Sequence, residues 1–169
     1  MRYWSMALCL LCGPALAAAE TRSAGRHEHG STALGIAVEG ESLVIEIDGP
    51  AANFIGFERK PATDREKQEL ARVLNVLRDG AALFLMPAGA QCRLQSAAVS
   101  PPEYGADGHA DLEAFWEFRC GSPAALTWVE AKLFAAFPGT ERLSASVVTA
   151  AGQKSVVLTP GTTRVLLPQ

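Results

Sequence analysis

The sequence contains none of the short motifs that mark the commonest catalytic and nucleotide-binding sites. It has no Gly-x-Ser-x-Gly elbow, no phosphate-cradling glycine-rich loop and no His-Glu-x-x-His helix. It also lacks clusters of basic residues, which argues against nucleic acid and anionic membrane surfaces as partners. A hydrolase based on paired carboxylates stays open, because the 18 acidic residues offer many pairs and none stands out.

Long hydrophobic runs are absent after the first nineteen residues. The apolar run from Met6 to Leu16 is too short for a membrane-spanning helix, which needs about 20 residues. Arg2 precedes this run, and two candidate small-x-small cleavage sites, Ala15-Leu16-Ala17 and Ala17-Ala18-Ala19, lie at its end. We therefore expect a secretory signal peptide at residues 1–19, a periplasmic protein and no membrane insertion after cleavage. The alternative is a leader that is retained as an anchor.

Cysteine becomes scarce once the leader is removed, because only Cys92 and Cys120 remain of the four. They are not in the Cys-x-x-Cys spacing that metal and redox sites favour, and disulfides persist in an oxidising compartment. We expect the two to be bonded, which would stabilise the fold by about 3–4 kcal/mol. Two thiolate metal ligands are the competing interpretation. Residues 20–31 are polar and predict a flexible, histidine-containing arm, and residues 32–169 predict a single domain.

Alternating apolar and polar residues predict β-hairpins at both ends of this domain, over residues 34–47 and 143–158. Two further strands are expected at residues 91–99 and 109–120. If they pair antiparallel, they bring Cys92 and Cys120 together. The segment 51–61 between the first hairpin and the next element is expected to be irregular.

Helical spacing of apolar residues predicts a helix over residues 64–79, opened by a capping box of Thr63 and Glu66. Gly80 is expected to take the left-handed cap of this helix. A second helix is expected at residues 130–137. The fold class is therefore α+β, with a mainly antiparallel sheet built from hairpins at both ends and packed with about two helices.

The chain has only three histidines, and two of them flank Glu28 where the leader ends. Neutral imidazole is the commonest protein ligand for transition metals, and zinc accepts histidine nitrogen and carboxylate oxygen together. The third histidine lies at a loop-to-strand junction between two aspartates. The candidate metal ligands are therefore His27, Glu28, His29, Asp107, His109 and Asp111. The arm would supply the flexible half of the site and the strands the fixed half. The alternative is a set of solvated surface histidines.

Several of these segments occur in the same order in one known family. The series is His27-Glu28-His29-Gly30, a hairpin, Ile55-Gly56-Phe57-Glu58-Arg59-Lys60-Pro61, Cys92-Arg93-Leu94, His109, Trp116-Glu117-Phe118-Arg119-Cys120 and Leu133-Phe134-Ala135-Ala136-Phe137-Pro138. It resembles the zinc-regulated periplasmic family of ZrgA type over nearly all of the mature chain. The resemblance implies a zinc-binding protein that assists a zinc-uptake ABC transporter, with the substrate-binding protein or the permease of that transporter as its partner.

The chain departs from the family pattern at two places. Family members typically carry a His- and Asp-rich insertion between the two cysteine-bearing strands, where this chain has only the short segment 101–109. They also tend to have histidine after Gly-Phe-Glu, where this chain has Arg59. Both departures remove ligands, so we expect at most one zinc ion per chain.

A non-catalytic zinc accessory protein is thus the function that the sequence predicts. Two alternatives stay open. One is an envelope interaction protein that binds no metal and uses the region of Gly56-Phe57-Glu58 for its partners. The other is a periplasmic hydrolase of unknown substrate.

Overall fold

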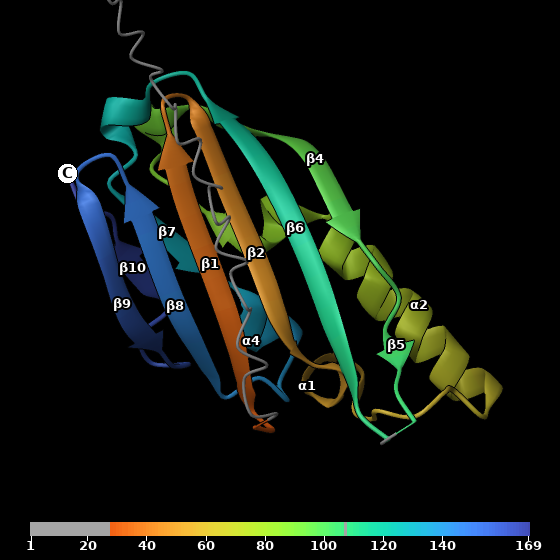
Figure 1. Cartoon of the computed structure of the whole chain (residues 1–169). Coiled ribbons are helices and arrows are strands. Elements are labelled where there is room, and N and C mark those ends of the chain that lie inside the picture. Colours follow the sequence, from red (N-terminus) through yellow and green to blue (C-terminus); the bar gives the residue numbers. More distant parts are fainter. Residues whose placement is uncertain (1–27, 107) are drawn as a thin grey trace, which may run out of the picture.

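The computed structural model describes residues 28–106 and 108–169. A seven-stranded sheet has the order β4-β6-β2-β1-β8-β9, with β5 paired to the edge of β6, and a three-stranded sheet has the order β10-β7-β3. The helices and the small sheet lie against one face of the large sheet, and no element of the described chain covers its other face (Figure 1). The predicted α+β fold with a mainly antiparallel sheet is confirmed.

The two predicted hairpins form the central and outer strands of the large sheet. The first consists of β1 (Ser31–Glu39) and β2 (Ser42–Pro50), and the second of β8 (Arg142–Thr149) and β9 (Gly152–Leu158). A parallel pairing of β1 with β8 joins them, so that residues from the two ends of the domain are neighbours. The sequence did not predict this parallel pairing.

The longest strand, β6 (Ala110–Cys120), pairs with β2 on one side and with β4 (Cys92–Val99) and β5 (Glu103–Tyr104) on the other. Every second side chain of β6 is buried, which is the alternation that a sheet with one covered face requires. Cys92 lies directly opposite Cys120 and is bonded to it. The predicted strand pair and disulfide are both confirmed.

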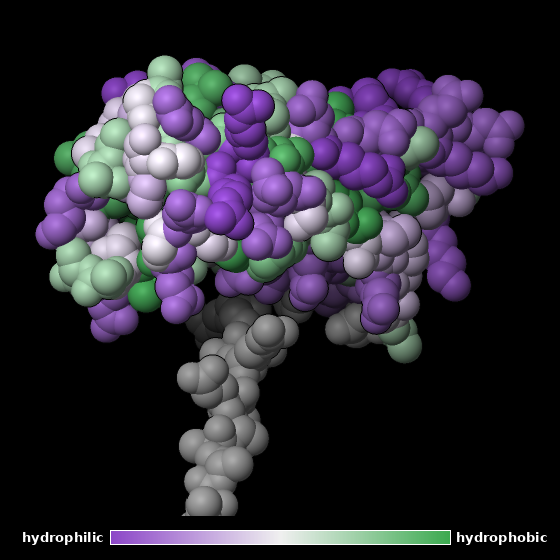
Figure 2. Space-filling model, turned by 90° about the horizontal axis from the view of Figure 1, so that it is seen from above, coloured by the Kyte–Doolittle hydropathy of each residue, from purple (hydrophilic) through white to green (hydrophobic). Residues whose placement is uncertain are grey.

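Helix α2 (Asp64–Arg78) begins with the predicted capping box, in which Thr63 and Glu66 each accept a backbone N–H. Its buried residues are Val73, Leu74 and Leu77, whereas its outer surface is hydrophilic and projects at the right of Figure 2. The predicted left-handed cap at Gly80 is wrong, because Asp79 caps the helix and Gly80 opens α3 (Gly80–Leu83). Glycine is needed at position 80 because a larger side chain would collide with the ring of Trp116, and not because the backbone there is left-handed.

Two other segments differ from the expectation. Residues 51–61 are not wholly irregular, because α1 (Ala51–Ile55) follows directly on Pro50 and buries Phe54 and Ile55. The helix expected over residues 130–137 is shortened to α4 (Leu133–Ala136), because the residues before it extend β7 (Trp128–Ala131). Strand β7 lies between two short strands in the small sheet.

The remaining elements complete the layer behind the large sheet. They are β3 (Phe84–Leu85), β10 (Arg164–Leu166) and the short 3₁₀ helices at Ala88–Ala90 and Pro123–Ala125. None of the helices in the described part of the chain has the length and apolar character needed to span a membrane.

Replacing Gly80 with alanine should destabilise the fold. A Cβ atom there would lie 2.3 Å from Cδ1 of Trp116, whose Nε1 donates a 2.7 Å hydrogen bond to the carbonyl of Leu77. The ring would have to move, so we expect the free energy of unfolding to fall by about 2–4 kcal/mol in urea titrations. Gly161→Ala is the control, because a Cβ there meets no atom within 4 Å. Equal effects of the two changes would contradict this account of Gly80.

The capping box of α2 should make stability depend on pH in acid. Hydrogen bonds from Arg59 and from the backbone N–H groups of Ala62 and Thr63 lower the pKa of Glu66 to about 2. The ionised carboxylate therefore stabilises the folded state above its ordinary pKa of 4.5, and this contribution is lost as the pH falls toward 2. Glu66→Gln should lower the free energy of unfolding at pH 7. Its difference from the parent should shrink between pH 4.5 and 2, whereas a constant difference would argue against this role.

Candidate metal centre

The carboxylate of Glu58 joins two of the three histidines. His29 Nε2 lies 2.9 Å from Glu58 Oε1, and His109 Nδ1 lies 2.9 Å from Glu58 Oε2. The Glu58 side chain is only 11% exposed, whereas those of His29 and His109 are 69% and 47% exposed. The result is a surface cluster of two imidazoles around one largely covered carboxylate, which we call the His29–Glu58–His109 cluster.

Three elements place these side chains at one end of the large sheet. His29 lies two residues before β1, His109 lies immediately before β6, and Glu58 lies three residues after α1. Gly56 ends α1 with a φ of 82°, a left-handed conformation that glycine adopts without strain. This turn leads the chain from the buried helix out to Glu58. Strands and a helix that are far apart in the sequence thereby converge on one carboxylate.

A buried asparagine fixes the chain beside His29. The side chain of Asn53 accepts the Gly30 N–H at 2.8 Å and donates to the Ser31 carbonyl at 2.9 Å and to Thr32 Oγ1 at 3.1 Å. Gly30 has a φ of 81°, and its carbonyl accepts the N–H groups of Glu141 and Arg142. The chain that enters β1 is therefore held from two sides.

The other predicted ligands are distributed differently. Glu28 forms an exposed ion pair with Arg142, with 2.7 Å between Oε1 and Nη2, so its carboxylate already has a partner on β8. Asp111 lies within β6, in register with Pro50 of β2 and Glu103 of β5. His27 and Asp107 lie outside the described residues. The structure thus brings His29 and His109 together and gives Glu28 a different partner.

Glu58 is the residue that the sequence did not identify as a ligand. The sequence suggested its Gly56-Phe57-Glu58 motif only as a surface for partners, and the structure shows a turn that presents the carboxylate to two histidines. The sequence held one sign that Glu58 lies near a metal site, because it directly precedes Arg59, the position at which family members tend to have histidine. Arg59 at that place is bonded to Glu66 and lies 5.6 Å from the ring of Phe57.

Within residues 28–106 and 108–169, no three His, Cys, Asp or Glu side chains are arranged to hold a metal ion as they stand. In the His29–Glu58–His109 cluster, the two imidazoles contact different oxygens of Glu58. The donor types suit zinc, which takes histidine nitrogen and carboxylate oxygen. One or both rings would have to turn for all three to reach one ion.

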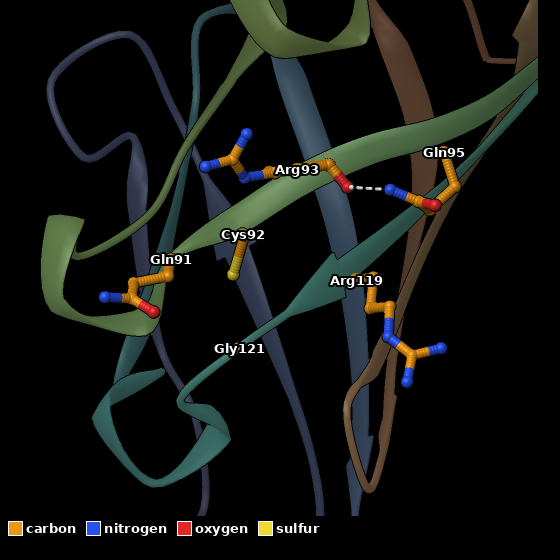
Figure 3. Close-up of a pocket in the computed structure, with 6 residues that line it drawn as sticks. All are labelled: Gln91, Cys92, Arg93, Gln95, Arg119 and Gly121. Atoms are coloured by element: carbon orange, nitrogen blue, oxygen red, sulfur yellow. Dashed lines mark hydrogen bonds between the residues drawn. The ribbon is translucent and has the colours of Figure 1, made fainter.

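The surface hollows lie elsewhere. One of about 560 Å³ lies beside the disulfide at the other end of β6, where Arg93 and Arg119 point away from each other (Figure 3). A second, of about 510 Å³, lies on the open face of the large sheet and is lined in part by Glu46, Asp48 and Glu113. His109 lines neither of these two hollows.

Comparison with known proteins identifies the family of this chain. No curated protein matches the chain. The family model described as "ZrgA family zinc uptake protein" matches residues 26–167, which include nearly all of the described residues and the whole His29–Glu58–His109 cluster. The match covers well over half of the chain, and it agrees with the resemblance in the order of motifs. The chain therefore belongs to the ZrgA family of zinc uptake proteins.

Proposed function

We propose that this protein binds one zinc ion in the periplasm and assists zinc uptake by an ABC transporter without catalysing a reaction. The observation that carries the proposal is the contact of His29 and His109 with one carboxylate, that of Glu58. The proposed ligands are these three residues. Family membership supports a role in zinc uptake.

The donor types of the three side chains, and the nearness of each histidine to Glu58, support zinc as the ion. Nitrogen and oxygen ligands about 2.0–2.1 Å from a tetrahedral zinc ion lie about 3.3 Å from each other. Each histidine nitrogen lies 2.9 Å from its own oxygen of Glu58, so both imidazoles are already next to the carboxylate, and a ring must turn for all three side chains to reach one ion. His29 can supply most of that movement, because it is the most exposed of the three and lies outside any strand.

Capture and transfer follow from the chemistry of imidazole. Neutral imidazoles hold zinc near pH 7 and release it when they become protonated or meet a stronger receptor. Both histidines are accessible from outside, so a partner can approach the ion without opening the fold. The proposed partner is the substrate-binding protein or the permease of the transporter.

Calorimetry should show one zinc ion bound per chain of the disulfide-bonded protein lacking residues 1–19. We expect His29→Ala, His109→Ala and Glu58→Gln each to weaken binding at least tenfold, because each removes or neutralises a ligand. Glu28→Gln is the matched control, since Glu28 is paired with Arg142 and should not contribute. Absence of zinc binding in the parent protein would overturn the proposed function. A loss with Glu28→Gln equal to that with Glu58→Gln would overturn the proposed ligand set.

The proposed compartment has its own test. If the leader is removed as the sequence predicts, the protein recovered from the periplasmic fraction of a bacterial host should begin at Glu20. Edman sequencing or intact-mass measurement reads this directly. A full-length chain that stays with the membrane fraction would show a retained leader and contradict periplasmic release.

A further inference from the structure

We propose that Asn53 is the positioning residue of the zinc site, because it fixes where His29 lies relative to Glu58. This inference rests on the proposed function for its meaning, but the hydrogen bonds behind it are independent of any metal. Asn53 itself touches none of the three proposed ligand side chains through a hydrogen bond. It would act through the backbone, because it links the residues that follow His29 to the helix that precedes Glu58.

The side chain of Asn53 uses both of its ends on one short stretch of chain. Its oxygen accepts from Gly30, the residue next to His29, and its nitrogen donates to Ser31 and Thr32. Asn53 is 3% exposed, so water does not replace these partners while the fold is intact. Gly30 and the first two residues of β1 are therefore tied to a single side chain of α1.

The same helix also determines the position of Glu58. Helix α1 has five residues, too few to be stable alone, and its position must come from packing. A Cβ atom at Gly139 would lie 2.6 Å from the Asn53 carbonyl oxygen, so the backbone of α1 is held closely from that side. The chain leaves α1 through Gly56 and reaches Glu58 two residues later. Asn53 thus ties the segment that carries His29 to the helix that presents Glu58.

His109 reaches the cluster by a different route. Helix α1 packs against β6, the strand that His109 precedes, and the register of β6 with β2 is set by their long ladder. His109 and Glu58 therefore keep their relative position without Asn53. His29 depends on Asn53 for its position relative to α1, because Gly30 is tied to α1 through Asn53, whereas the bonds of its carbonyl to Glu141 and Arg142 tie it only to the start of β8. The expected consequence of losing the Asn53 hydrogen bonds is a selective release of His29.

Two substitutions separate the hydrogen bonds from the volume of the side chain. Asn53→Leu keeps a similar volume and removes all three bonds. Asn53→Asp keeps the oxygen that accepts the Gly30 N–H, and the Thr32 hydroxyl can rotate to donate to its other oxygen, but the bond to the Ser31 carbonyl is lost because a carboxylate cannot donate. Val147→Ala is the control for general destabilisation, because Val147 is fully buried in β8 and pairs with Ile36, well inside β1.

Zinc titration by calorimetry should show a loss of at least tenfold in affinity for Asn53→Leu, a smaller loss for Asn53→Asp, which keeps the bond to Gly30, and no change for Val147→Ala. Affinity that falls in proportion to stability in all three variants would overturn the positioning role. So would parental affinity in a folded Asn53→Leu protein.

A second readout needs no metal. In ¹⁵N-correlated spectra of the metal-free protein at fixed pH, the His29 imidazole should move toward the shifts of a free side chain in Asn53→Leu, while His109 stays unchanged. If the parent binds no zinc but this shift occurs, the proposed function fails and the role of Asn53 stands. If His29 and His109 respond alike, or if neither does, Asn53 does not position His29.

Discussion

The packing of the Trp116 indole between the large sheet and the helical layer is the contact on which the rest of the structure depends. The ring is fully buried, its Nε1 donates to the carbonyl of Leu77 at the end of α2, and Phe84 meets it edge-on at 4.9 Å. A buried indole N–H without an acceptor is costly, so this bond fixes α2 on the sheet. It also fixes the register of β6, because a shift of one residue would turn Trp116 to the open face. His109 directly precedes that strand and Cys120 is its last residue, so the register of β6 sets the position of both.

The sequence predicted the parts of the fold that depend on neighbouring residues. The alternation in β6 and in the two hairpins, and the capping box of Thr63 and Glu66, are local signals that the structure confirms. The parallel pairing of β1 with β8 and the small sheet were not predictable, since they join segments far apart in the sequence through strands as short as two residues. Helix α1 was missed for a related reason: five residues carry too little periodicity, and their packing decides their conformation.

The cluster shows the same division between local and distant information. Residue chemistry alone selected His29 and His109, which lie just before β1 and β6. The chain beside His29 is held by Asn53 and by β8, so this part of the expected flexible arm has fixed contacts. Glu58 could not be selected from eighteen acidic residues, because its contact with the histidines spans 29 and 51 residues of sequence and depends on the turn at Gly56. Glu28 was the more obvious candidate ligand because it is next to His29 in the sequence, yet it forms an ion pair with Arg142 of β8.

The occupied state of Glu58 bears on what kind of zinc site this chain would have. In the metal-free protein, each carboxylate oxygen of Glu58 is hydrogen-bonded to one histidine. An ion that binds all three side chains must replace both of these contacts. That replacement lowers the net affinity compared with an open ligand set, while the largely covered carboxylate keeps the two imidazoles near each other between binding events. Arg59, which stands where relatives tend to carry histidine, is engaged by Glu66 and adds no donor. A site with three ligands, of which His29 and His109 are exposed, is better suited to passing zinc on than to storing it.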